Sequence, residues 1–79
     1  MAELKETIDE MLSDDYIDRF KAEYKQLVIR IDNLNDYIKH YKSYVKEIEL
    51  YLMGKQLNAM IEYRNILELR AAIDKIDLS

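Results

Sequence analysis

Apolar side chains recur along the first half of the chain at alternating intervals of three and four residues. The pattern runs from Ile17 and Phe20 to Ile38 and Tyr41, a span of more than three heptads. This spacing places one apolar strip along a helix and is typical of a helix that packs lengthwise against another. Acidic and N-capping residues precede the strip, so we predict a helix over residues 14 to about 40. The strip consists of Ile17, Phe20, Tyr24, Leu27, Ile31, Leu34, Ile38 and Tyr41.

A second apolar strip follows and predicts a helix from about residue 48 to 76. It is broader than the first, as expected for a helix that contacts more than one neighbour. Gly54, the single glycine of the chain, lies near its start and costs about 1 kcal/mol relative to alanine unless the chain bends there. The strip is formed by Leu50, Met53, Leu57, Met60 and Leu67, with Ala59, Tyr63, Ile66, Ile73 and Ile76 beside it.

The stretch between the two strips, IKHYKSYVK, decides how the helices are connected. It contains neither Gly nor Pro, and the phase of the first strip continues through Val45, Ile48 and Leu52. Two architectures therefore stay open, namely one continuous helix of about 60 residues and a hairpin that turns at about 41–47. The change from a narrow to a broad strip favours the hairpin.

We therefore predict an all-α fold, an antiparallel helical hairpin over residues 14–79. A lead-in segment over residues 1–13 precedes it and forms a short N-terminal helix. With 79 residues, the chain is near the size at which one core provides only a few kcal/mol of stability. The chain has no cysteine and a single histidine, so neither a disulfide nor a metal site can add to this stability. We therefore expect a homo-oligomer that associates through the heptad-like strips.

The charge and the composition of the chain exclude several classes of binding partner and activity. The net charge of −4 argues against binding to duplex nucleic acid, which requires a broad basic surface. No apolar run approaches the roughly 18 residues of a membrane span, and the acidic N-terminus does not fit a signal peptide, so we expect a cytoplasmic protein without membrane contact. The chain has no glycine-rich phosphate-binding loop, and none of its serines lies in a sequence motif of a catalytic nucleophile. The sequence therefore predicts no enzyme, no cofactor and no metal.

One group of charged residues is expected to meet across the hairpin. If the chain turns near residue 45, Arg19 and Glu23 of the first helix come opposite Arg70 of the second, with Tyr63 two turns away on the same edge. One interpretation is a Glu23–Arg70 ion pair with Tyr63 packed above it. The other is an anion site, in which Arg19 and Arg70 contact a phosphate and Tyr63 stacks or donates its hydroxyl.

The basic stretch at the turn offers a second candidate. Lys39 and Lys42 lie where the first helix ends, and cations there complement the exposed carbonyl groups of a helix C-terminus. That structural role accounts for most of the charge. If association brings turns of several copies together, Lys39, Lys42 and Tyr44 become a second-choice anion site.

The runs RFKAEYKQLVIRIDNLNDYI and QLNAMIEYRNILELRAAI resemble a family of very small proteins of tailed phages and prophages, related to those of crAss-like phages. The resemblance covers residues 16–76, although VKEIELYLMGK replaces the Ser/Pro-containing break of the family. The matching residues of the first run are Arg19, Lys21, Glu23, Leu27, Arg30, Ile31 and Leu34. Those of the second run are Gln56, Leu57, Ala59, Met60, Tyr63, Ile66, Leu67, Arg70 and Ile73.

This family is similar in shape and size to phage anti-defence hairpin proteins that sequester cyclic nucleotide signals as homo-oligomers. The resemblance therefore implies a phage-encoded, non-enzymatic protein in the cytoplasm of the bacterial host, with a cyclic oligonucleotide as ligand. Cations for phosphates and flat rings for bases are the groups that such binding needs, and the chain has both. The alternative is a structural or protein-binding hairpin without a small ligand.

Overall fold

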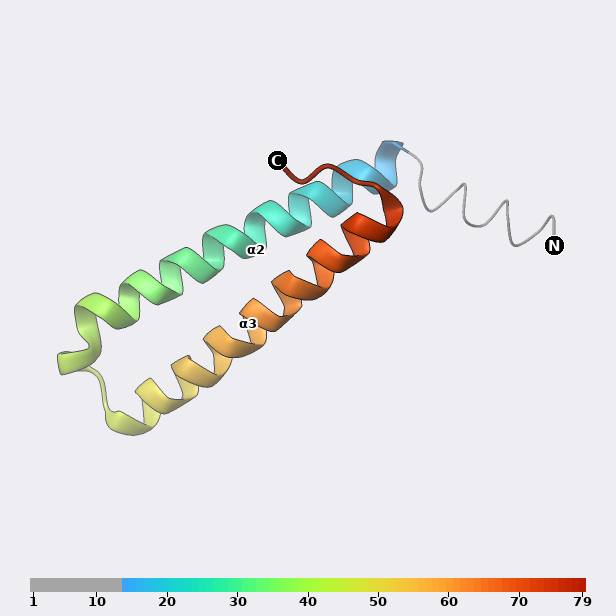
Figure 1. Cartoon of the computed structure of the whole chain (residues 1–79). Coiled ribbons are helices and arrows are strands. Elements are labelled where there is room, and N and C mark those ends of the chain that lie inside the picture. Colours follow the sequence, from blue (N-terminus) through green and yellow to red (C-terminus); the bar gives the residue numbers. More distant parts are fainter. Residues whose placement is uncertain (1–13) are drawn as a thin grey trace.

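The structure is a computed structural model that describes residues 14–79, in which two long helices run antiparallel and are joined by a tight turn (Figure 1). Helix α2 comprises Asp14–Tyr41, a short 3-10 helix η1 comprises Lys42–Tyr44, and helix α3 comprises Glu47–Asp74. The predicted all-α hairpin is thus confirmed, and the continuous-helix alternative is wrong. The predicted N-terminal lead-in segment lies outside the described residues.

Helix α2 carries charges that suit both of its ends. Asp14 and Asp15 occupy its first turn, where the helix dipole favours negative charge, and Lys39 and His40 occupy its last turn, where it favours positive charge. His40 donates a hydrogen bond through Nδ1 to the carbonyl oxygen of Asp36 at 2.8 Å. The histidine therefore has a local structural role at the helix end.

The turn is made without glycine or proline. After η1, Val45 adopts φ −111° and ψ 143°, and Lys46 adopts φ −62° and ψ 146°, so two successive extended residues interrupt the helix. The backbone N–H of Leu50 bonds to the carbonyl oxygen of Lys46 at 2.9 Å and begins the hydrogen bonding of α3. Nothing local forces these conformations, so we attribute them to the packing of α3 back against α2.

A left-handed residue ends α3. Lys75 has φ 57° and ψ 40°. The N–H of Ile76 bonds to the carbonyl oxygen of Ala71 at 2.8 Å, and the N–H of Lys75 bonds to that of Ala72 at 3.4 Å. These two bonds form a Schellman motif, whose usual contact between the residue after the left-handed one and the last turn is present in the buried pair Ile76 and Ala71. The helix therefore ends at Asp74, two residues earlier than the sequence pattern suggested.

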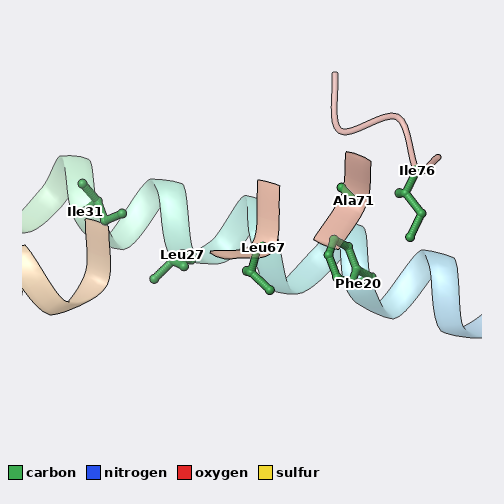
Figure 2. Close-up of a cluster of buried hydrophobic side chains, with 6 residues drawn as sticks. All are labelled: Phe20, Leu27, Ile31, Leu67, Ala71 and Ile76. Carbon is green, nitrogen blue, oxygen red and sulfur yellow. The ribbon is translucent and has the colours of Figure 1, made fainter. Parts of the chain in front are cut away.

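The core extends from the end of the hairpin where the start of α2 meets the end of α3 to Ile31, just past the middle of α2 (Figure 2). Leu67 is fully buried, and burial of such a side chain contributes about 2–3 kcal/mol. Toward the turn the facing residues, such as Leu34 and Met53, are only half-buried. The hairpin is therefore packed most firmly at the end away from the turn. The buried residues are Phe20, Leu27, Ile31, Leu67, Ala71 and Ile76.

The two predicted apolar strips differ in how much of each is buried. Most of the α2 strip is buried or half-buried against α3, and only Tyr41 at its end is exposed. In α3, the residues from Leu50 to Leu67 that continue the heptad spacing face α2, whereas Ala59, Tyr63, Ile66 and Ile73 beside them are exposed to solvent. Ile76, which the sequence placed in the same flank, lies beyond α3 and is buried. Helix α3 is therefore apolar on two sides, and α2 covers one of them. Among residues 14–79, neither helix is apolar enough over its length to cross a membrane.

Lys75→Gly should stabilise the hairpin by about 0.5–1 kcal/mol, because a left-handed conformation is costly for every residue except glycine. Urea denaturation followed by circular dichroism measures the change. Lys55→Gly, in the middle of α3, is the matched control and should lose about 1 kcal/mol. A loss of stability in Lys75→Gly would contradict the left-handed helix end.

Gly54→Ala should also stabilise the hairpin, by about 1 kcal/mol, since an added Cβ meets nothing within 4 Å and alanine is the better helix former. The converse change, Ala22→Gly at an exposed position of α2, should lose a similar amount. Thermal unfolding of the two variants gives the comparison. If Gly54→Ala is destabilising instead, another backbone approaches the helix at this glycine.

Candidate functional site

A cleft of about 320 Å³ opens where the start of α2 lies beside the end of α3. The two arginines expected to meet across the hairpin, Arg19 and Arg70, both line it. They come from different helices and are brought together because the antiparallel arrangement places these two helix ends side by side (Figure 1). The other lining residues are Tyr16, Phe20 and Glu23.

Arg70 is held in place by two aromatic residues. Its Nη2 donates a hydrogen bond to the hydroxyl of Tyr16 at 2.9 Å, and its guanidinium carbon lies 5.2 Å from the centre of the Phe20 ring. The two rings are themselves in contact, with centroids 6.1 Å apart and planes at 46°. A guanidinium has five N–H donors, and the bond to Tyr16 uses one of them. The side chain is thus oriented while retaining donors for an anion.

Arg19 is less constrained. It pairs with Asp15 one turn earlier, with 3.6 Å between Nη2 and Oδ2, and the two side chains are 73% and 82% exposed. Exposed pairs of this kind contribute less than about 1 kcal/mol. An anion that entered the cleft could therefore draw Arg19 away from Asp15 at little cost.

Glu23 lines the cleft but does not pair with Arg70. Within residues 14–79 the structure contains no Glu23–Arg70 ion pair, because the guanidinium is turned toward Tyr16 and Phe20. The cleft accordingly has two cationic side chains and one anionic side chain along its walls. Its net charge favours a single phosphate or carboxylate over a highly charged anion.

Tyr63 is not among the lining residues of this cleft. It is 41% exposed on α3, seven residues before Arg70 and so about 10 Å away along the helix axis. Tyr16 provides the phenol beside Arg70 instead. The sequence did contain a signal for this, because Tyr16 and Phe20 are one helical turn apart and Phe20 belongs to the apolar strip of α2.

The residues of the second candidate lie at the turn. Lys39 is in the last turn of α2, and Lys42 and Tyr44 are in η1. All three are exposed, and Tyr44 is 85% exposed. Nearby, the rings of Tyr37 and Tyr41 pack together with centroids 5.0 Å apart. In one copy of the chain these groups form an exposed basic and aromatic corner.

A larger cleft, of about 430 Å³, lies between α2 and the C-terminal segment, and the sequence pattern did not predict it. This segment folds back along α2 after the Schellman motif (Figure 1). Asp77 accepts hydrogen bonds from the N–H and the hydroxyl of Ser79, at 3.0 and 2.6 Å. These bonds, and more weakly the charge of Lys21, lower the pKa of Asp77. The cleft is lined by Lys21, Tyr24, Lys25, Val28, Ile29, Leu78 and Ser79.

A polar link joins the helices beside the core. The hydroxyl of Tyr24 donates a hydrogen bond to Oε1 of Glu68 at 2.9 Å. Nε of Arg64 lies 3.8 Å from the same oxygen, which is within ion-pair range but too long for a hydrogen bond. Arg64 occupies a heptad position between Met60 and Leu67, so its half-buried place could have been read from the spacing. The Tyr24–Glu68 bond thus joins α2 to α3 beside the apolar core.

Comparison with known protein families identifies a family to which this hairpin is similar. Residues 14–73 match the family described as Sequestin, and this match covers α2, the turn and nearly all of α3. The chain belongs to the Sequestin family. The family name points to a sequestering protein that binds and retains a partner or ligand, and both arginines of the cleft lie within the Sequestin match. No curated protein sequence and no solved structure matches the chain.

The hydrogen bond of Tyr24 to Glu68, followed by burial and the charge of Glu68, raises the pKa of the phenol above its ordinary value of 10.0. A raised folded-state pKa stabilises the fold at pH values below 10, and this contribution is lost as the pH rises through the folded-state pKa. The stability difference between the protein and its Tyr24→Phe variant should therefore be constant up to that region and shrink above it.

Urea denaturation at a series of alkaline pH values measures this difference. Tyr44→Phe, at the exposed turn, is the matched control and should show no such dependence. A pH-independent difference for Tyr24→Phe would contradict the contribution of the Tyr24–Glu68 bond.

Proposed function

We propose that this protein is a phage-encoded, non-enzymatic sponge that sequesters a cyclic nucleotide immune messenger in the cytoplasm of the bacterial host. Membership in the Sequestin family supports a binding role. The ligand class and the phage origin are supported by the resemblance to small hairpin proteins of tailed phages. Tight stoichiometric binding is sufficient for such a role, because a messenger that is held cannot reach its receptor.

The observation that carries the proposal is the convergence of Arg19 and Arg70 on one aromatic-walled cleft. The planar fork of a guanidinium matches the paired oxygens of a phosphodiester, and charge-assisted hydrogen bonds of this kind are among the strongest that proteins make. Tyr16, which lines the cleft beside Arg70, supplies a flat ring on which a base can stack. Phosphate and base are the two parts of a cyclic nucleotide that recur in every member of the class.

The size of the cleft favours a shared site. At about 320 Å³ it is at the lower limit for pockets that bury a small molecule, and a cyclic di- or trinucleotide needs more room. The protein therefore acts in this proposal as a homo-oligomer, in which clefts of different copies together enclose one ligand. The turn residues Lys39, Lys42 and Tyr44 form the second-choice site, and association of turns would complete it.

Isothermal titration calorimetry with a panel of cyclic di- and trinucleotides tests the proposal. We expect one member of the panel to bind stoichiometrically at micromolar protein concentration. Arg19→Ala should weaken that binding about tenfold or more, because a hydrogen bond to a charged group contributes about 1.5–3 kcal/mol. Arg19 is exposed and its ion pair with Asp15 is a surface pair, so the variant should fold normally.

Three further measurements complete the experiment. Arg30→Ala, at an exposed arginine of α2 outside the cleft, is the matched control and should bind as the unaltered protein does. Lys42→Ala should weaken binding only if the turn is the site. The nucleotide released by denaturing the complex should be chemically intact. Absence of binding by every member of the panel, or release of a cleaved nucleotide, would contradict the sponge.

A further inference from the structure

Helix α3 has a second apolar face that α2 does not cover. Its side chains recur at alternating intervals of four and three residues on the side of α3 away from the core residues Leu67 and Ala71. Its large apolar members are between 47% (Ile66) and 79% (Ile73) exposed. Exposed large apolar side chains thus occupy both ends of this face, with Lys55, Ala59 and Glu62 between them, and exposed apolar patches of this kind mark interaction surfaces. We call it the outer face, formed by Ile48, Leu52, Lys55, Ala59, Glu62, Ile66, Leu69 and Ile73.

The hairpin by itself has a small core, so the free energy of folding of a single copy is expected to be small. Within residues 14–79 only six apolar side chains are buried, and they extend from the end of the hairpin away from the turn to Ile31, just past the middle of α2. A single pair of helices buries one side of each helix, and a chain of this size usually requires a further source of stability. A second apolar helix packed on the outer face would provide it along the whole length of α3.

The charges of the outer face identify the occupant and its orientation. Lys55 and Glu62 are its only charged residues, and they have opposite signs. A parallel, in-register copy of α3 would place Lys55 against the partner's Lys55 and Glu62 against the partner's Glu62, so that like charges face each other. An antiparallel copy related by a two-fold axis brings Lys55 within about one turn of the partner's Glu62, and does so twice. The face is therefore complementary to itself.

We propose that α3 packs on α3 of a second copy of this chain, antiparallel about a two-fold axis through the centre of the outer face. In this register Ile48 lies opposite the partner's Ile73, and Leu52 lies opposite the partner's Leu69. The small Ala59 at the centre permits close approach of the two backbones and leaves room for the partner's Glu62. The stem of Lys55 covers the partner's Ile66 while its ammonium reaches that glutamate.

Neighbouring registers are less favourable. A shift of one heptad in one direction places the partner's Glu62 against Leu52, and a shift in the other direction places it against Ile66. Each shift buries a carboxylate against an apolar side chain and leaves large apolar residues at the ends of α3 uncovered. The self-association anticipated from the chain's small size is thereby assigned to one surface, one orientation and one register. The interface requires no ligand, so it is tested on the protein alone.

Light scattering coupled to size-exclusion chromatography tests the surface. The protein should be a dimer or a higher assembly of dimers at micromolar concentration, and Ile66→Glu should shift it to smaller species. Ile29→Glu on α2 is the matched control, because Ile29 is 49% exposed and Ile66 is 47% exposed. It should leave the assembly unchanged. Circular dichroism should show equal helix content in both variants, since neither position is buried in the hairpin.

Disulfide cross-linking tests the orientation and the register. The chain has no cysteine, so single cysteines can be introduced without background. A mixture of Leu52→Cys and Leu69→Cys proteins should form mixed disulfides readily under mild oxidation, whereas neither variant alone should cross-link. Cross-linking of Leu52→Cys with itself would indicate a parallel pair and overturn the proposal.

A monomeric wild-type protein, or an assembly that Ile66→Glu does not weaken, would also overturn it. The outer face would then be left for a different protein. These outcomes can be distinguished from those of the nucleotide titrations, because cross-linking and light scattering are measured on the protein without ligand and keep the same result if no nucleotide binds.

Discussion

Burial of Leu67 between α3 and the apolar strip of α2 is the contact on which the rest of this hairpin depends. It is the most completely buried side chain of the described residues, and it lies within a cluster of apolar residues contributed by both helices and the C-terminal segment (Figure 2). An antiparallel helix pair has no other shared interior, so its stability is concentrated wherever its largest side chains meet. Here they meet near the chain ends rather than at the turn.

The same packing builds the candidate binding cleft. Phe20 is a core residue, yet it also supports the guanidinium of Arg70 and contacts Tyr16 at the cleft wall. A side chain that is held by a packed ring loses little freedom when it binds a ligand, so its hydrogen bonds are more effective than those of a mobile surface arginine. The cleft is therefore placed in the firmest part of the molecule, whereas the basic residues of the turn lie where the helices are least buried.

The two apolar sides of α3 connect stability with assembly. One side is used by α2, and the other is bare along the whole helix in a single copy. If a second copy covers that side, folding and association become one equilibrium and the stability of the protein depends on its concentration. A shared ligand would then add to the same balance, since anything that binds only the assembled form favours assembly. A small protein can in this way gain stability from association without having a large core of its own.

The spacing of apolar residues by itself determined that the chain forms two helices, which side of α2 is buried, and that Arg19 and Arg70 come together if the helices run antiparallel. These features follow from the helical repeat, which is local. The backbone conformation of the turn, the left-handed Lys75, the return of the C-terminal segment along α2 and the choice of Tyr16 rather than Tyr63 beside Arg70 were decided by the tertiary structure. No glycine or proline marks these places, so each conformation is selected by the apolar contacts it permits between residues that are distant in the sequence.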